Sequence, residues 1–208
     1  MPLVSLVSGT PKRVLDVGCA TGRVLSHFKR RGAEFVAGVE IFPGVAEEAR
    51  RNADVDEVVT GDIESEELPW PEQSFDLVIA SFVLEHVSDP WAVLRKLRKL
   101  TAPGGQLIGA LPNVRHVSVL LPLLCTGKWK YEDQGIMDWT HLRFFTRSTI
   151  CELLESSGFE PRQVVPQITA VKYKVANLLT ASLLRDFFGF AYNFSAAADD
   201  ERTVNRVA

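Results

Sequence analysis

Val14-Leu15-Asp16-Val17-Gly18-Cys19-Ala20-Thr21-Gly22 carries the strongest structural signal in the sequence. Its apolar first half predicts a short buried strand over residues 13–17, and its glycines predict a tight turn. A helix is expected next, because Val24, Leu25 and Phe28 recur on one helical face. A strand that enters a helix through a glycine-rich turn brings its backbone close to a ligand and points free amides at it.

The turn fits neither of two common phosphate-binding patterns. No Gly-Lys-Ser/Thr follows, as a P-loop requires, and the G-x-G-x-x-G spacing of dinucleotide-binding domains is absent. Asp16 also lies where those strands are usually apolar. The stretch therefore predicts a ligand site of another kind.

Strands and helices alternate after this stretch. Further strands are expected at 34–39, 55–59, 75–80 and 106–111, and helices at 43–52 and from Asp89-Pro90 onward. In the helix after Pro90, Trp91, Leu94 and Leu97 are expected to form the buried stripe. The strands are nearly continuous apolar runs, which is typical of parallel sheets covered by helices on both faces. The pattern predicts an α/β, Rossmann-like, doubly wound sheet whose ligand lies beyond the carboxyl ends of the strands.

The last third of the chain departs from this alternation. A long irregular insert is expected at 112–145, followed by a helix at 146–157, a strand at 159–168, a helix over 171–188 and a seventh strand at 189–197. We therefore expect one domain over residues 1–198, built on a mostly parallel seven-stranded sheet. Residues 199–208 are polar and are expected to form a flexible tail.

Composition excludes several classes of function. The 208 residues carry a net charge of −3, without the basic face that a nucleic-acid partner requires. The three cysteines are scattered without zinc-ligand spacing, so we expect no metal site and no disulfide framework. No apolar run approaches the roughly 20 residues that span a bilayer, and the first residues do not form a signal peptide. These observations predict a cytoplasmic protein without stable membrane insertion, and they leave a homodimer open.

The sequence resembles the class I S-adenosylmethionine-dependent methyltransferases. Residues 14–22 are similar to motif I of that family, D-x-G-x-G-x-G, with Ala20 in place of the middle glycine. A positive φ at Ala20 would be strained. Residues 36–40 resemble the second strand with its terminal acid, residues 75–87 resemble motif IV, and residues 101–105 resemble the proline-glycine-glycine turn.

The resemblance implies the class I methyltransferase fold and the cofactor S-adenosylmethionine. It assigns Glu40 to both ribose hydroxyls and Asp62 to the adenine amino group. Asp16 suits the ammonium group of the cofactor, while amides near the glycine turn suit its carboxylate. The expected cofactor-binding residues are Asp16, Gly18, Cys19, Ala20, Thr21, Gly22, Glu40, Ile41, Asp62, Ile63, Ser81, Phe82 and His86.

Acceptor recognition is expected in the insert, because long loops beyond strand ends usually carry specificity. His141 is the leading candidate for a general base, and His86 and Asp138 are the other catalytic candidates. A structural alternative is that His141 only braces the following helix. Trp129 and Tyr131 could stack on a ring or close over the core.

The acceptor remains open at this point. Residues 138–146 resemble a stretch of bacterial glycan-associated methyltransferases, and more loosely one of quinone-biosynthesis methyltransferases. The first comparison favours methyl transfer to a hydroxyl or amine of a small molecule such as a sugar or glycan precursor. The second favours a quinone or other lipophilic ring, with apolar residues 117–124 lining a tunnel or touching a membrane surface. A non-catalytic S-adenosylmethionine-binding regulatory module is the third alternative.

Overall fold

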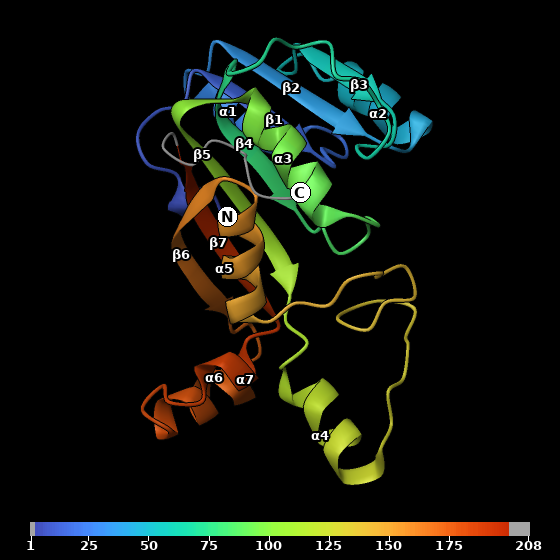
Figure 1. Ribbon diagram of the computed structural model, residues 1–208, viewed down its shortest axis with the longest axis vertical. Coiled ribbons are helices and arrows are strands. Elements are labelled where there is room, and N and C mark those ends of the chain that lie inside the picture. Colours follow the sequence, from blue (N-terminus) through green and yellow to red (C-terminus); the bar gives the residue numbers. More distant parts are fainter. Residues whose placement is uncertain (1–2, 200–208) are drawn as a thin grey trace.

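The computed structural model describes residues 3–199. Figure 1 shows one layered α/β body with two helical extensions at one end. The amino-terminal half contains η1 (Val4–Leu6), β1 (Arg13–Val17), α1 (Arg23–Arg30), β2 (Phe35–Glu40), α2 (Pro43–Arg50), β3 (Glu57–Thr60), β4 (Phe75–Ser81) and α3 (Pro90–Leu100). The carboxyl-terminal half contains β5 (Thr101–Pro112), α4 (Val117–Thr126), α5 (Arg147–Ser156), β6 (Phe159–Gln167), α6 (Val171–Leu179), α7 (Arg185–Phe188) and β7 (Ala191–Ala198).

The seven strands form one sheet in the order β3-β2-β1-β4-β5-β7-β6. β1 to β5 pair in parallel, whereas β7 runs antiparallel to both β5 and β6. The order reverses between β1 and β4, and a doubly wound sheet binds its ligand at such a point. The predicted fold class is confirmed.

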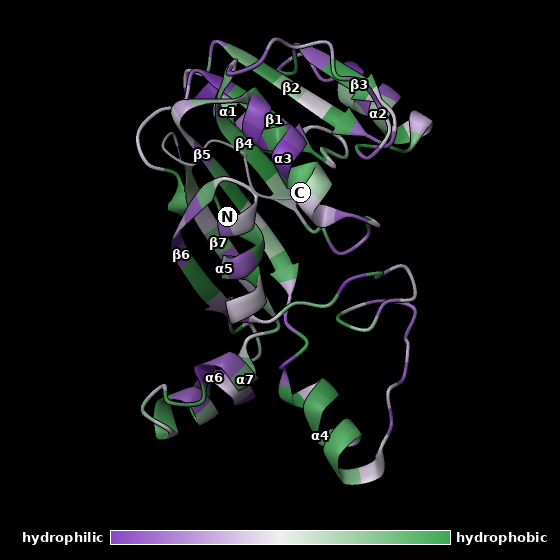
Figure 2. Cartoon of the chain, viewed as in Figure 1, coloured by the Kyte–Doolittle hydropathy of each residue, from purple (hydrophilic) through white to green (hydrophobic). Residues whose placement is uncertain are grey.

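Alternation along the strands builds a core on each face of the sheet. Leu15 and Val17 of β1 belong to the core shared with α3 and α5, whereas Val14 belongs to the core shared with α1 and α2. Successive strand residues point to opposite faces, so a fully apolar strand is buried on both. Figure 2 shows the resulting apolar strands inside the body.

The structure corrects three details of the sequence-based prediction. Trp91 is 40% exposed, and the buried stripe of α3 runs through Val93, Leu94, Leu97 and Leu100. The insert is not irregular throughout, because α4 forms despite Pro122 inside it. The helix expected over 171–188 is divided into α6 and α7, with positive φ angles at Ala181 and Ser182 between them.

The helical extensions lie beyond the carboxyl end of β5, where α4 and the α6–α7 pair project from the body (Figure 1). α4 is coloured as mostly apolar in Figure 2, and its Leu121 and Leu124 are exposed. No helix within residues 3–199 is both long and apolar enough to cross a bilayer. Of the expected tail, residues 200–208 lie outside the described residues.

Candidate active site

A cavity of about 680 Å³ opens at the carboxyl ends of the parallel strands. Its walls come from the turn after β1, the end of β2, the loop after β3 and the segment after β4. Of the expected cofactor residues, the walls include Gly18, Ala20, Glu40, Ile41, Asp62, Ile63, Phe82 and His86. The topology has therefore brought side chains from four separate strand ends into one chamber, which we call the donor cavity.

The glycine turn adopts the left-handed conformations that its sequence suggested. Gly18, Ala20 and Gly22 have φ angles of 69°, 48° and 75°. A side chain at Gly18 has no room, since its Cβ would lie 2.7 Å from Cγ2 of Val83. Ala20 carries the strain expected of a residue with a Cβ at positive φ.

Glu40 is held in place by two backbone amides. Its Oε2 accepts a hydrogen bond from the amide of Ala20 at 2.9 Å, and its Oε1 accepts one from Phe42 at 3.0 Å. A carboxylate has about four acceptor positions, so two remain for a vicinal diol. Asp62 is oriented similarly, because its Oδ1 accepts a hydrogen bond from the amide of Glu64 at 2.9 Å.

Asp16 is buried near the end of β1, next to Val17 and Gly18, which line the donor cavity. Burial, with a smaller contribution from the charge of Glu40, raises the pKa of Asp16 to about 8. A carboxylate in this position gains from a nearby cation, because the cation offsets both effects. The pair of acids thus suits a ligand that carries positive charge and a diol, as S-adenosylmethionine does.

Five of the expected cofactor residues lie outside the cavity walls: Asp16, Cys19, Thr21, Gly22 and Ser81. Cys19 turns its side chain toward the sheet, where a Cβ on Gly38 would lie 2.4 Å from Sγ of Cys19. Its amide, with that of Gly18, donates a hydrogen bond to the carbonyl oxygen of Val39. These contacts fix the turn that shapes the donor cavity.

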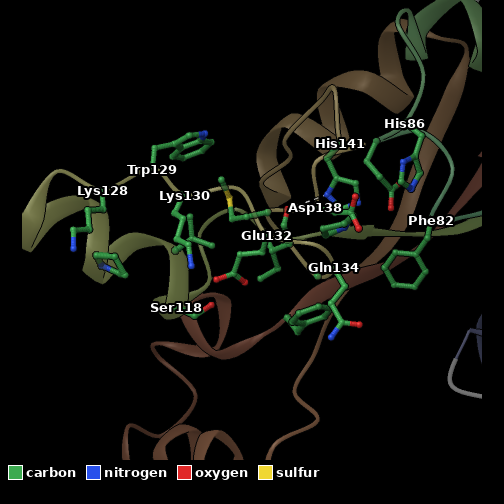
Figure 3. A pocket seen from close by; sticks show the side chains of 18 residues that line it. Phe82, His86, Ser118, Lys128, Trp129, Lys130, Glu132, Gln134, Asp138 and His141 are labelled. Atoms are coloured by element: carbon green, nitrogen blue, oxygen red, sulfur yellow. Dashed lines mark hydrogen bonds between the residues drawn. The ribbon is translucent and has the colours of Figure 1, made fainter.

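A second cavity of about 760 Å³ lies beside the first and is enclosed largely by the insert (Figure 3). Trp129, Asp138 and His141 of the insert line it, together with Phe190 from the segment before β7. Phe82 and His86 belong to the walls of both cavities. The two chambers therefore adjoin at these two residues, and we call the second one the acceptor cavity.

Hydrogen bonds fix the tautomers of the two histidines at this junction. Thr140 donates its hydroxyl hydrogen to Oδ1 of Asp138, so its oxygen accepts the Nδ1 hydrogen of His86, at 3.0 Å. Nδ1 of His141 donates to the carbonyl oxygen of Ile136 at 2.9 Å. Nε2 of each ring is left with a lone pair, as a proton acceptor requires.

The three catalytic candidates thus lie in one network. The ring centroids of His86 and His141 are 4.8 Å apart. Burial and, to a lesser degree, the neighbouring His141 lower the pKa of His86. Asp138 lies at the cavity wall, and the hydrogen bonds from Thr140 lower its pKa.

Glu85 is a site residue that the sequence reasoning missed. It is fully buried and lines the acceptor cavity, and neither of its carboxylate oxygens has a hydrogen-bond partner among residues 3–199. Burial raises its pKa to about 8. Its carbonyl oxygen accepts hydrogen bonds from the amides of Leu142 and Arg143, which ties the insert to the segment after β4. The sequence feature that could have indicated Glu85 is its position directly before His86, which is already a candidate.

The insert also contributes to the donor cavity, through Thr140. Trp129 lines the acceptor cavity and packs edge-on against Phe144, with centroids 5.2 Å apart. Tyr131 instead stacks on Trp139 at 5.0 Å, outside the lining of either large cavity. Of the two aromatic candidates for acceptor contact, the structure places Trp129 in a position to make it.

Comparison with known proteins agrees with this geometry. Residues 2–164 match a family described as a methyltransferase domain. A ubiquinone biosynthesis O-methyltransferase of Neisseria meningitidis serogroup A is 32% identical over 155 residues, covering 72% of this chain and 64% of that relative. A malonyl-(acyl-carrier protein) O-methyltransferase of Serratia marcescens is 30% identical over 175 residues, covering 75% of this chain and 68% of that protein.

Similarity of fold extends over nearly the whole chain. A methyltransferase structure from Mesorhizobium loti, described as dependent on S-adenosylmethionine, superposes with a TM-score of 0.67 at 19% identity, over 94% of this chain and 95% of that one. Alignment with the ubiquinone-biosynthesis relatives spans less than two thirds of their length, 64% and 60% in two cases. The family match and the donor cavity together show that the chain belongs to the class I methyltransferases, whose methyl donor is S-adenosylmethionine.

Proposed function

We propose that this protein transfers the methyl group of S-adenosylmethionine to a ring hydroxyl of a lipophilic small molecule. The observation that carries the proposal is the junction of the two cavities at Phe82 and His86. A donor in one chamber and an acceptor in the other would meet there, and holding two reactants in line can supply roughly 7–11 kcal/mol of the barrier.

The lining of the acceptor cavity favours a flat apolar acceptor. Its apolar residues are Phe82, Pro112, Val119, Pro122, Trp129, Ile136, Met137 and Phe190. Such side chains bury a ring well, and the polar groups among them can orient its substituents. The ubiquinone-biosynthesis relatives named above add support for an acceptor of this class.

The chemistry of the base also favours a phenolic hydroxyl. A phenol has a pKa of about 10, roughly 3 to 4 units above the pKa of an imidazolium ion. Transfer of the phenol's proton to a neutral imidazole therefore costs about 5 kcal/mol. The hydroxyl of a sugar is a weaker acid than a phenol. With the pKa of water, about 15.7, as the upper limit, transfer of its proton to the same imidazole costs up to about 12 kcal/mol. The Nε2 lone pair of His141 suits the smaller step, and proton transfer of this kind contributes about 10²–10⁴-fold to a rate.

A sugar or glycan precursor remains the second candidate, because polar side chains also reach this cavity. Lys128, Lys130, Glu132 and Gln134 line it, and Trp129 offers a face on which a sugar ring could stack. These groups sit on the insert, whereas the apolar residues come from both the insert and the sheet edge.

The deciding experiment supplies methyl-labelled S-adenosylmethionine with either a prenylated phenol or a glycoside of similar size. We expect label in the phenol, at a rate at least 10²-fold above that in the glycoside. Label in the glycoside alone would replace the proposal with the sugar alternative. Saturable cofactor binding without transfer to any acceptor would favour the regulatory module and contradict the proposal.

A further inference from the structure

Glu85 lies in a cluster with His86 and His141, and the methyl-transfer proposal gives this buried carboxyl no role. One carboxylate oxygen of Glu85 and one ring nitrogen of each histidine all lie within 4.8 Å of one another. Glu85 and His86 follow β4, and His141 comes from the insert. The two hydrogen bonds from Leu142 and Arg143 to the carbonyl oxygen of Glu85 hold these segments together.

The cluster contains electron-pair donors, and neither histidine ring directs its Nδ1 hydrogen into it. Both Nδ1 atoms already direct their hydrogens elsewhere, toward Thr140 and Ile136. The carboxylate of Glu85 is fully buried, lines the acceptor cavity and has no hydrogen-bond partner in the part of the chain that the structure describes. A buried acceptor that lacks a donor costs about 1–3 kcal/mol, and more when it is charged, so the arrangement calls for a bound cation or proton.

The surroundings of the two rings match those of metal ligands. A metal-binding histidine nearly always donates its other ring hydrogen to a carbonyl, a carboxylate or a water, which fixes the ring and its tautomer. His141 does so with the carbonyl of Ile136, and His86 does so with Thr140, which is itself bonded to Asp138. Figure 3 shows His86, His141 and Asp138 gathered at one side of the acceptor cavity.

We propose that Glu85, His86 and His141 bind a divalent transition-metal ion, of which Zn²⁺ is the type, at the wall of the acceptor cavity. Two imidazoles and one carboxylate suit zinc and its neighbours, whereas Mg²⁺ and Ca²⁺ prefer oxygen ligands. With bonds of about 2.1 Å, tetrahedral ligand atoms lie about 3.4 Å apart, so the side chains close by roughly 1 Å around the ion. Three protein ligands leave the fourth position of Zn²⁺ for a water or a substrate, and all three residues line the acceptor cavity.

The proposed metal site differs from the sequence-based expectation that the protein has none. That expectation relied on close spacing of cysteines and histidines, and here the fold brings together ligands from two distant segments. Within its own segment, none of the three ligands stands in a spacing typical of metal-binding sites. The site becomes visible only when the insert packs against the end of β4.

The ion's part in catalysis rests on the proposed function, whereas its binding does not. With the ion bound, Nε2 of His141 is a ligand and no longer a proton acceptor, so the ion would take over the activation of the acceptor. A hydroxyl bound at the open position would have its pKa lowered and would release its proton to solvent. The oxygen would then form a bond to the methyl carbon as the carbon–sulfur bond breaks, leaving S-adenosylhomocysteine as a neutral thioether. No oxidant or further reactant is required.

The test uses the full chain, stripped with a chelator and kept free of cofactor and acceptor. Co²⁺ is added while its visible absorption is followed, and Zn²⁺ is titrated by calorimetry. We expect one ion per chain, with binding at least tenfold weaker in Glu85→Gln and in His141→Gln. Glu132→Gln, a carboxylate change in the same cavity but outside the cluster, should bind as the unaltered protein does. Each variant is first checked for folding by its circular dichroism and its affinity for S-adenosylhomocysteine.

Absence of Co²⁺ and Zn²⁺ binding at about 1 mM would overturn the proposal, as would equal binding by the folded Glu85→Gln variant. Methyl transfer that persists in the chelated protein would remove the ion's catalytic role while leaving the proposed function in place. Loss of transfer to every acceptor, with metal binding intact, would instead remove the proposed function. The two failures are therefore distinguishable.

Discussion

Replacing Asp16 by asparagine should make the free protein more stable and its cofactor binding weaker. Asp16 is 4% exposed, and burial raises its pKa from 3.8 to about 8. The folded protein therefore binds a proton more tightly than the unfolded chain does, so the free energy of unfolding falls as the pH rises from about 4 to about 8. Asparagine has nearly the same side-chain shape as aspartate and cannot ionise. The free energy of unfolding of the variant should therefore not fall with pH in this way.

The magnitude follows from the two pKa values. At pH 7 a carboxyl shifted from 3.8 to about 8 lowers the free energy of unfolding by about 4 kcal/mol, whereas below pH 4 the effect vanishes. Asp16→Asn should therefore unfold about 8–16 °C higher at pH 7, at 2–4 °C per kcal/mol for a chain of this size. At pH 4 the two proteins should unfold at the same temperature, apart from any change in packing.

The assay is thermal unfolding from pH 4 to pH 8 without ligand, followed by calorimetry with S-adenosylmethionine. Asp133→Asn, an exposed aspartate of the insert, is the matched control and should change neither property. We expect the affinity of Asp16→Asn for the cofactor to fall at least tenfold, because the ammonium group loses its counter-charge. A gain in stability that is equal at pH 4 and pH 7 would show that ionisation of Asp16 does not destabilise the folded protein, and unaltered affinity would show that Asp16 does not bind the ammonium group.

Three further substitutions test single contacts. Glu40→Ala should weaken S-adenosylhomocysteine binding at least tenfold in calorimetry, because hydrogen bonds to a charged group contribute about 1.5–3 kcal/mol each; unchanged affinity would remove its assignment to the ribose. His141→Gln should lower kcat by about 10²–10⁴ while the cofactor Kd stays constant, whereas a matching loss of thermal stability would indicate the bracing role. Ala20→Gly should raise the free energy of unfolding in urea by about 0.5–1 kcal/mol, since relief of the left-handed conformation exceeds the added chain entropy; a decrease would show that the φ of 48° is not strained.

The strand order and the donor cavity could be predicted because their signals are local. A buried parallel strand is apolar throughout, a helix repeats every 3.6 residues, and ligands bind where parallel strands end. Glu40 and Asp62 could be placed in the cavity for this reason. The strain at Ala20 could be anticipated only conditionally, because Ala20 replaces the middle glycine of the motif that the sequence resembles; the structure supplies the positive φ.

The remaining features depend on contacts between distant segments. Trp91 fits a helical stripe by spacing, but the stripe that meets the sheet is centred on Leu94 and Leu97. Thr140 reaches the donor cavity only because Glu85 holds the insert against β4. Neither the burial of Glu85 nor its lack of a partner has any trace in the local sequence.

A crystal structure with S-adenosylhomocysteine bound would test most directly whether methyl transfer takes place where the donor cavity and the acceptor cavity meet. We expect the ribose hydroxyls on Glu40 and the sulfur atom beside Phe82 and His86, facing the cavity lined by Trp129. A nucleoside bound in the acceptor cavity, or a sulfur atom directed away from the junction, would contradict the claim that the two chambers exchange a methyl group there.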